Sequence, residues 1–269
     1  MEGLVHVYPK GAVRALDGVD LVLSAGERVA LIGQNGSGKT TLVRHLNGLL
    51  RPTEGRVLID GQATSQMTVA ALAARVGLAF QDPDRQIFAR TVRDEVAFGP
   101  RNLGRRGAEL DGAIAAALDA VGLAGDAARN PYDLGYARRK LLTIASVLAM
   151  ETPLVVLDEP TTGQDARGVE RVGRIVESLA AAGRGVVVIS HDMRFVAEHA
   201  ARVVVMRAGR VTLDGPPGAV FAEPRWPELA ASWLEAPVAA QIGARLGLGS
   251  TPTDAALVAA LVTQARSEG

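Results

Sequence analysis

A phosphate-binding loop motif lies near the start of the chain. Residues 33–40 read GQNGSGKT, which fits the pattern G-x-x-x-x-G-K-[ST]. Glycines let a backbone wrap closely around a phosphate, and amides at the start of a helix present partial positive charge to it. Lys39 can reach the β- and γ-phosphates, and the Thr40 hydroxyl can ligate Mg²⁺. The motif predicts a nucleotide-binding set: Asn35, Gly36, Ser37, Gly38, Lys39, Thr40 and Thr41.

The alternative for this motif is an ordinary glycine-rich turn before a helix. The strand-like run RVALI precedes it directly, and helical spacing of apolar residues follows it. A phosphate loop requires both of these flanking elements. The context therefore favours nucleotide binding.

A pair of carboxylates follows a second apolar run. Residues 154–160 read LVVLDEP and place Asp158 and Glu159 at the end of a buried strand, where adjacent side chains point in different directions. We expect Asp158 to hold Mg²⁺ through a water, and Glu159 to orient or deprotonate the water that attacks the γ-phosphate. Taken alone, such an acidic pair is more simply explained as two carboxylates that face solvent at the end of a strand. Together with a phosphate loop it predicts ATP hydrolysis.

Two more polar residues follow apolar runs. His191 comes after VVVIS, at the carboxyl end of a strand, where ligands of α/β proteins bind. A neutral imidazole there can donate to the γ-phosphate. Gln81 follows VGLAF and can contact Mg²⁺ or water and report the nucleotide state to a partner. Taken alone, each would more often be a structural residue.

The elements that position these residues alternate along the chain. Short apolar runs at 28–33, 56–60, 76–80, 154–158, 186–190 and 203–207 are typical of strands buried on both faces. Helical patterns separate them, such as Val169, Val172, Val176 and Leu179. We predict an α/β fold with a mainly parallel sheet and helices on both sides. Alternating Val19, Leu21 and Leu23 predict a smaller antiparallel β layer before this core.

The organisation beyond the sheet is predicted to be helical. No comparable strand run occurs from about 82 to 150, so this stretch, about 83–150, is interpreted as a helical insertion. From Phe221 prolines interrupt the chain, and helical spacing then resumes through Ile242, Leu246 and Leu257. We predict one domain over 1–220 and a C-terminal helical appendage over 221–269.

Composition limits the function classes. The chain has 269 residues, with 29 basic and 29 acidic side chains, which argues against a protein held mainly by charge on nucleic acid or anionic lipid. No apolar run reaches the roughly 18 residues of a membrane span, and no secretory leader begins the chain, so a cytoplasmic protein is expected. Absent cysteines exclude thiolate sites. Only three lysines occur, at positions 10, 39 and 140, so a lysine in this arginine-rich chain calls for a reason.

Together these residues resemble those of an ABC-type ATPase over about residues 3–220. The order is Tyr8, GQNGSGKT, Gln81, a helical insertion, LVVLDEP, the turn TTGQD and His191. The resemblance implies that Tyr8 stacks on adenine. It also implies that Asp165, in TTGQD, lies in the loop that crosses a dimer interface beside the partner's site.

A narrower resemblance concerns two further segments. Residues 80–104, FQDPDRQIFARTVRDEVAFGPRNLG, and residues 234–261 of the tail are similar to those of energy-coupling-factor and cobalt or nickel importer ATPases. This resemblance implies that the first segment bears a groove for a coupling helix of a transmembrane partner. It implies that the appendage helps to hold two ATPases together. The alternatives are an amphipathic surface loop and a packed helical tail.

The family signature, Leu-Ser-Gly-Gly-Gln, is altered here. Alignment on the helix LLTIASVLAM places Gly135, Tyr136, Ala137 and Arg138 at the Ser-Gly-Gly-Gln positions. In the family this element caps the γ-phosphate held by the other ATPase. Two interpretations follow. Either backbone amides suffice, with Arg138 or Arg139 supplying charge, or this chain completes a weak site on its partner, as in a heterodimer, which we slightly favour.

The resemblance implies an ATP- and Mg²⁺-dependent ATPase subunit of an importer for a vitamin or transition metal. Its partners would be a transmembrane coupling subunit, a substrate-binding membrane subunit and a second ATPase, at the cytoplasmic face of the plasma membrane, without nucleic acid. The alternatives are a soluble ABC ATPase and a regulatory nucleotide-dependent module with little turnover. A soluble ATPase acting on nucleic acid would ordinarily show a basic surface or tandem cassettes, and intact Asp158, Glu159 and His191 argue against a regulatory module.

Overall fold

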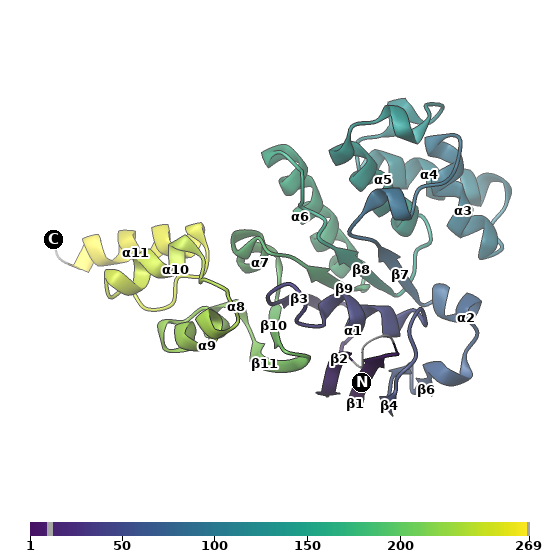
Figure 1. Ribbon diagram of the computed structural model, residues 1–269. Coiled ribbons are helices and arrows are strands. Elements are labelled where there is room, and N and C mark those ends of the chain that lie inside the picture. The colour runs from purple at the N-terminus through teal and green to yellow at the C-terminus, as the bar shows by residue number, and fades with distance from the viewer. Residues whose placement is uncertain (10–12, 268–269) are drawn as a thin grey trace.

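A six-stranded sheet forms the centre of the protein (Figure 1). The computed structural model describes residues 1–9 and 13–267, so Lys10 lies outside the described residues. The strand order is β11-β10-β3-β9-β8-β7, and within this sheet only β11 runs antiparallel to its neighbour. The strands are β3 (Arg28–Ile32), β7 (Val76–Ala79), β8 (Leu154–Asp158), β9 (Gly185–Ile189), β10 (Arg202–Arg207) and β11 (Arg210–Gly215). The prediction of a mainly parallel α/β sheet is confirmed.

Two small antiparallel sheets accompany the central one. The first has the order β2-β1-β4, and the second pairs β5 with β6. Helix α1 packs between the first small sheet and the central sheet, because its apolar side chains share one core cluster with both. The bounds are β1 (Glu2–Tyr8), β2 (Val13–Val19), α1 (Lys39–Leu46), β4 (Glu54–Arg56), β5 (Leu58–Ile59) and β6 (Gln62–Ala63).

Two expected strands differ from the structure. The run RVLID, 56–60, does not join the parallel sheet: β4 is an exposed edge strand against β1, and β5 pairs with β6. Asp60 and Gly61 both have positive φ and form a tight turn, so the chain folds back at once. The early antiparallel strand ends at Val19, so Leu21 and Leu23 lie beyond β2 even though Leu21 is buried.

Helices α2 to α7 lie between or after the strands of the central sheet. The stretch between β7 and β8 contains α3, α4 and α5, which form a group at the upper right of Figure 1. This group shares a core cluster with β7, β8 and α6. Helix α7 follows β9. The bounds are α2 (Val69–Ala73), α3 (Val92–Asn102), α4 (Gly107–Ala120), α5 (Tyr136–Leu148), α6 (Ala166–Ala181) and α7 (Met193–His199).

The C-terminal segment lies at the opposite end of the molecule, at the left of Figure 1. It contains α8 (Pro217–Val220), α9 (Trp226–Ala231), α10 (Val238–Arg245) and α11 (Asp254–Ser267). Phe221 and Leu229 are buried in one cluster with Ile32 of β3 and Val205 of β10. The first part of this segment is therefore anchored on the sheet, whereas α11 buries none of its described side chains.

None of the described helices combines the length and the apolar character that a membrane crossing requires.

Candidate functional site

A cavity of about 440 Å³ lies at the carboxyl ends of the central strands. Its lining comes from β1, β2, the loop before α1 with the start of that helix, the segments that end or follow β7, β8 and β9, and the turn between β10 and β11. It brings together predicted site residues that are far apart in the sequence: Tyr8, Asn35, Gly36, Ser37, Gly38, Lys39, Thr40, Thr41, Gln81, Asp158, Glu159 and His191.

Two glycines of the loop are required by close backbone packing. Gly33 has φ +148°, and a Cβ there would lie 2.2 Å from the Met206 carbonyl oxygen. Gly38 has φ +104°, and a Cβ there would lie 2.6 Å from the Ala15 carbonyl oxygen. Gly38 is the N-cap of α1 and makes no side-chain capping bond, so the first amides of α1 face the cavity without a cap. The loop has the shape that an anion site needs.

Lys39 is held inside the loop. Its Nζ donates hydrogen bonds to the carbonyl oxygens of Gly33 at 2.6 Å and Gln34 at 3.0 Å. Burial lowers its pKa, while the nearby Glu159 and Asp158 carboxylates act in the opposite direction. The ammonium is thus pre-positioned at the mouth of the loop, where phosphates would accept from it.

The residues expected to hold Mg²⁺ offer a suitable donor set. The Thr40 hydroxyl donates to Asp158 Oδ2 at 3.2 Å, whereas Asp158 Oδ1 is buried without a hydrogen-bond partner. Burial raises the pKa of Asp158. A buried acceptor without a partner is costly unless a ligand satisfies it. Hard oxygen donors beside a phosphate site are what Mg²⁺ prefers, so these residues fit the ion.

Glu159 lies in the environment expected of a catalytic base. It is 5% exposed, and burial followed by the neighbouring Asp158 raises its pKa to about 7. Its φ of +52° turns the chain sharply just after β8, a strained conformation that clusters at functional sites. His191 Nε2 lies 3.1 Å from Glu159 Oε1. Burial and, after it, the Lys39 charge lower the pKa of His191, which favours the neutral imidazole.

Tyr8 occupies the rim of the cavity at the end of β1. Its hydroxyl lies 3.1 Å from Thr41 Oγ1, which ties the strand to the start of α1. The His6 ring packs edge-on against the Tyr8 ring, with centroids 4.6 Å apart. The tyrosine ring is therefore fixed beside the phosphate loop, where it can meet a nucleotide base.

Lys140 is a residue of this site that sequence reasoning left without a role. It lies on α5, is fully buried, and its Nζ donates to the carbonyl oxygens of Phe80, Gln81 and Asp158. Burial lowers its pKa to about 8. The scarcity of lysine was the available signal, although it could not reveal these partners. Arg14 and Gly209 also line the cavity and were not predicted.

The altered signature residues lie away from this cavity. Gly135 is the N-cap of α5, and Tyr136, Ala137 and Arg138 form its first turn. None of the four is among the described residues that line the cavity. Arg138 is ion-paired with Asp126. Gly135 makes no side-chain cap, so no side chain of the N-cap residue satisfies the first amides of α5.

The TTGQD loop packs against this signature segment of the same chain. Gln164 Nε2 donates to the Ala137 carbonyl oxygen at 2.8 Å, and the Tyr136 ring covers Gly163, where a Cβ would lie 2.9 Å from it. Asp165 caps α6 by accepting from the Gly168 amide at 2.7 Å. The signature segment and the TTGQD loop are therefore in direct contact.

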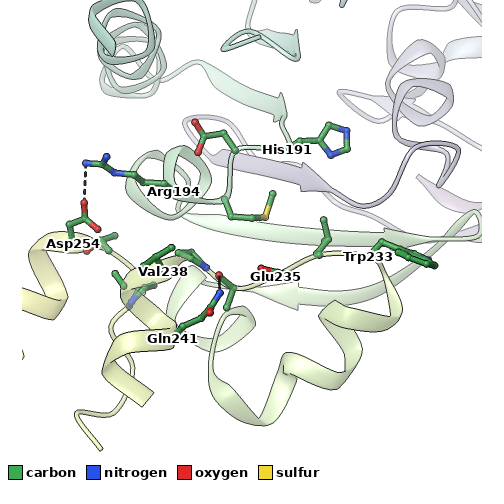
Figure 2. Close-up of a pocket in the computed structure, with 15 residues that line it drawn as sticks. His191, Arg194, Trp233, Glu235, Val238, Gln241 and Asp254 are labelled. Carbon is green, nitrogen blue, oxygen red and sulfur yellow. Dashed lines mark hydrogen bonds and ion pairs between the residues drawn. The ribbon is translucent and has the colours of Figure 1, made fainter. Parts of the chain in front are cut away.

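A second cavity, of about 420 Å³, lies between the His191 loop and the C-terminal segment (Figure 2). Arg194, on α7, pairs with Asp254 at the start of α11 at 2.9 Å. Gln241 Nε2 donates to the Ala236 carbonyl oxygen at 2.8 Å. The C-terminal segment is thus in contact with the helix that directly follows His191.

Comparison with known proteins agrees with this geometry. The family model described as ABC transporter matches residues 16–162. An energy-coupling factor transporter ATP-binding protein of Symbiobacterium thermophilum is 43% identical over 253 residues, which are 91% of this chain and 86% of the relative. The structure of cbiO1 from Clostridium perfringens, part of the ABC transporter complex cbiONQ, superposes with a TM-score of 0.75 at 32% identity, covering 91% of this chain and 94% of that one.

The chain therefore belongs to the ABC transporter family, and the predicted resemblance to its ATPases is confirmed. The narrower resemblance is confirmed as well, because two relatives of which the chain covers 86% and 71% are named energy-coupling factor transporter ATP-binding proteins. Other relatives are much longer. The chain spans 38% of the length of an ABC transporter ATP-binding protein of Caldanaerobacter subterraneus, to which it is 44% identical over 218 residues (81% of the chain).

Proposed function

We propose that this chain is the ATP-hydrolysing subunit of an energy-coupling-factor importer that takes up a vitamin or a transition metal. The observation that carries the proposal is the cavity in which the phosphate loop, Asp158, Glu159 and His191 meet. The two relatives named as energy-coupling factor transporter ATP-binding proteins support the transport role. The chain would act at the cytoplasmic face of the plasma membrane through its partners.

The chemistry follows from the positions of the side chains. When ATP binds, Lys39 exchanges its hydrogen bonds to Gly33 and Gln34 for phosphate oxygens, and Tyr8 stacks on adenine. Thr40, Asp158 and Gln81 would hold Mg²⁺, which neutralises charge on the β- and γ-phosphates. Glu159 takes the proton of the attacking water, since its pKa of about 7 is close to the working pH. His191 donates to the γ-phosphate as a neutral imidazole.

Glu159→Gln tests the catalytic assignment. Glutamine keeps the shape of the side chain but cannot accept the proton, so we expect retained binding of a fluorescent ATP analogue and loss of turnover. Phosphate release and nucleotide titration measure the two quantities on one preparation. Normal turnover in this variant contradicts the assignment of the base.

We propose that a second ATPase subunit completes the site. The open amides of the Gly135 turn lie outside this chain's own cavity, which supports a γ-phosphate contact in trans. The altered signature favours a heterodimer in which this chain completes a weak site on its partner. Asp165 and its loop would lie at that interface, since they pack on the signature segment.

We propose that residues 221–269 are a C-terminal appendage that strengthens this dimer. Apolar side chains that are 39% to 81% exposed gather there on α10, α11 and the turn before them: Trp233, Val238, Ile242, Leu246, Val258, Leu261 and Val262. An apolar surface of this kind marks an interaction site. Truncation after residue 220 would cut through a cluster anchored on the sheet, so Ile242→Asp with Leu261→Asp is the sharper test. We expect a shift from dimer to monomer in analytical ultracentrifugation.

We propose that the segment 80–104 receives a coupling helix of a transmembrane subunit, which works with a substrate-binding membrane subunit. Phe88 and Phe98 support this, because they are 60% and 49% exposed and their rings pack edge-on with centroids 4.7 Å apart. Co-purification of membrane proteins from detergent extracts with the tagged full chain tests it. Phe88→Ala with Phe98→Ala should lose this capture while the variant still binds nucleotide. Equal capture contradicts the proposed groove.

A further inference from the structure

Lys140 makes an unusual set of contacts for a buried cation. The side chain is fully buried, and its three ammonium hydrogens have three backbone acceptors. The Nζ-to-oxygen distances are 2.9 Å to Phe80, 2.7 Å to Gln81 and 2.7 Å to Asp158. Burying an ammonium is costly unless its donors are satisfied, so the site provides every acceptor that this group can use.

These acceptors lie where two neighbouring strands separate. Strands β7 and β8 pair in parallel register up to Ala79 and Leu157. One residue further, β8 still pairs with β9 through Asp158, whereas the chain after β7 leaves the sheet as the Gln81 loop. Lys140 occupies this fork. Its ammonium donates to carbonyl oxygens of the Gln81 loop and of the end of β8. These carbonyls lie beyond the last paired residues of β7 and β8.

A second side chain ties the same loop to the same helix. The Phe80 amide donates to Gln86 Oε1 at 2.9 Å, and Gln86 Nε2 donates to the Thr143 carbonyl oxygen of α5 at 3.3 Å. The loop is thus attached to α5 at two points. Of these two side chains, Lys140 also reaches the end of β8, where Asp158 and Glu159 begin the catalytic turn.

We propose that Lys140 is a positioning residue for ATP hydrolysis. It fixes the end of β8, and so the Asp158 and Glu159 carboxylates, relative to the Gln81 loop and to the helix that begins with the Gly135–Arg138 signature. The role rests on the proposed ATPase function. A lysine suits it because a compact ammonium directs three donors to converging carbonyls, whereas the broad planar fork of arginine does not.

The expected consequence is a loss of turnover without a loss of ATP binding. In Lys140→Met three buried carbonyl oxygens lose their donor, so the strand end shifts to find new partners. Small displacements at a catalytic group are expensive in rate, and loss of a residue that orients metal ligands typically costs about 10–100-fold in activity. We therefore expect kcat to fall by about 10–100-fold, with little change in the KM for ATP. Lys140→Gln retains two N–H donors, so its kcat should lie between those of the unaltered chain and Lys140→Met.

Leu142→Ala is the matched control. Leu142 is fully buried on the same helix, two residues further, and its side chain belongs to the apolar cluster. Both substitutions should lower the melting temperature. Only those at Lys140 should lower kcat, measured in the complex that co-purifies with the tagged full chain. An equal fall in kcat for Leu142→Ala and Lys140→Met, or a Lys140→Met complex with unaltered kcat, overturns the proposal.

Two further outcomes keep the test decisive. If Lys140→Met does not fold, Lys140→Gln replaces it, and an unaltered kcat in that variant again overturns the proposal. If the unaltered complex does not hydrolyse ATP, the proposed function itself fails. The positioning role is supported if the unaltered complex hydrolyses ATP, Lys140→Gln lowers kcat, and Lys140→Met lowers it further.

Discussion

Replacing Glu159 by glutamine should stabilise the protein in the absence of nucleotide and Mg²⁺. The side chain is 5% exposed, and burial together with Asp158 raises its pKa from the ordinary 4.5 to about 7. An ionised Glu159 is therefore a cost to the folded state. Glutamine has nearly the same shape and carries no charge, so the variant does not bear this cost.

The size and the pH window follow from the two pKa values. A rise from 4.5 to about 7 corresponds to roughly 3 kcal/mol of differential interaction between the two protonation states. The folded state holds a proton in this window that the unfolded state has released, so the unaltered chain loses stability as pH rises from about 4.5 to about 7. The stability difference should be near zero below pH 4.5 and reach roughly 3 kcal/mol by about pH 8.

Urea denaturation across this pH range, without nucleotide or Mg²⁺, measures the difference. Glu170→Gln is the control, because Glu170 is an exposed partner of Arg174 on α6 and should give only a small difference, of about 0.5 kcal/mol, with little pH dependence. A Glu159→Gln difference that is constant with pH, or a variant less stable than the unaltered chain at alkaline pH, would refute the assignment of a raised pKa.

Three further predictions concern nucleotide binding and assembly. Gly38→Ala should destabilise the chain by about 1–3 kcal/mol and weaken ATP binding, because a Cβ would lie 2.6 Å from the Ala15 carbonyl oxygen at positive φ; urea denaturation and titration with a fluorescent ATP analogue check both effects. Tyr8→Ala should weaken ATP binding by about 1–3 kcal/mol and Tyr8→Phe much less, since stacking needs only the ring; equal losses in the same titration contradict stacking. Gly135→Ser should raise ATP turnover of the assembled complex by restoring the missing hydroxyl, and unchanged turnover means that this hydroxyl does not limit activity.

The local elements of the site could be predicted because their sequence signals are local. The loop GQNGSGKT is bounded by an apolar strand and a helix within twenty residues, and LVVLDEP carries its own strand. Such patterns depend on neighbours in the chain. The run RVLID was wrongly assigned to the parallel sheet even though its own signal is local. Its apolar residues resemble those of a buried strand, but the Asp60-Gly61 pair that ends it is a hairpin signal, and this turn folds the chain back onto itself.

By itself, the sequence determined the parallel α/β class, the phosphate loop and the identities of the acidic pair, because spacing and residue type suffice for these. The tertiary structure alone decided which distant groups share one environment. Burial and the proximity of Asp158 raise the pKa of Glu159. Lys140 shows the difference most clearly: its rarity was visible in the sequence, but its three acceptors are supplied by segments 18 to 60 residues away, which only the folding of β7, β8 and α5 brings together.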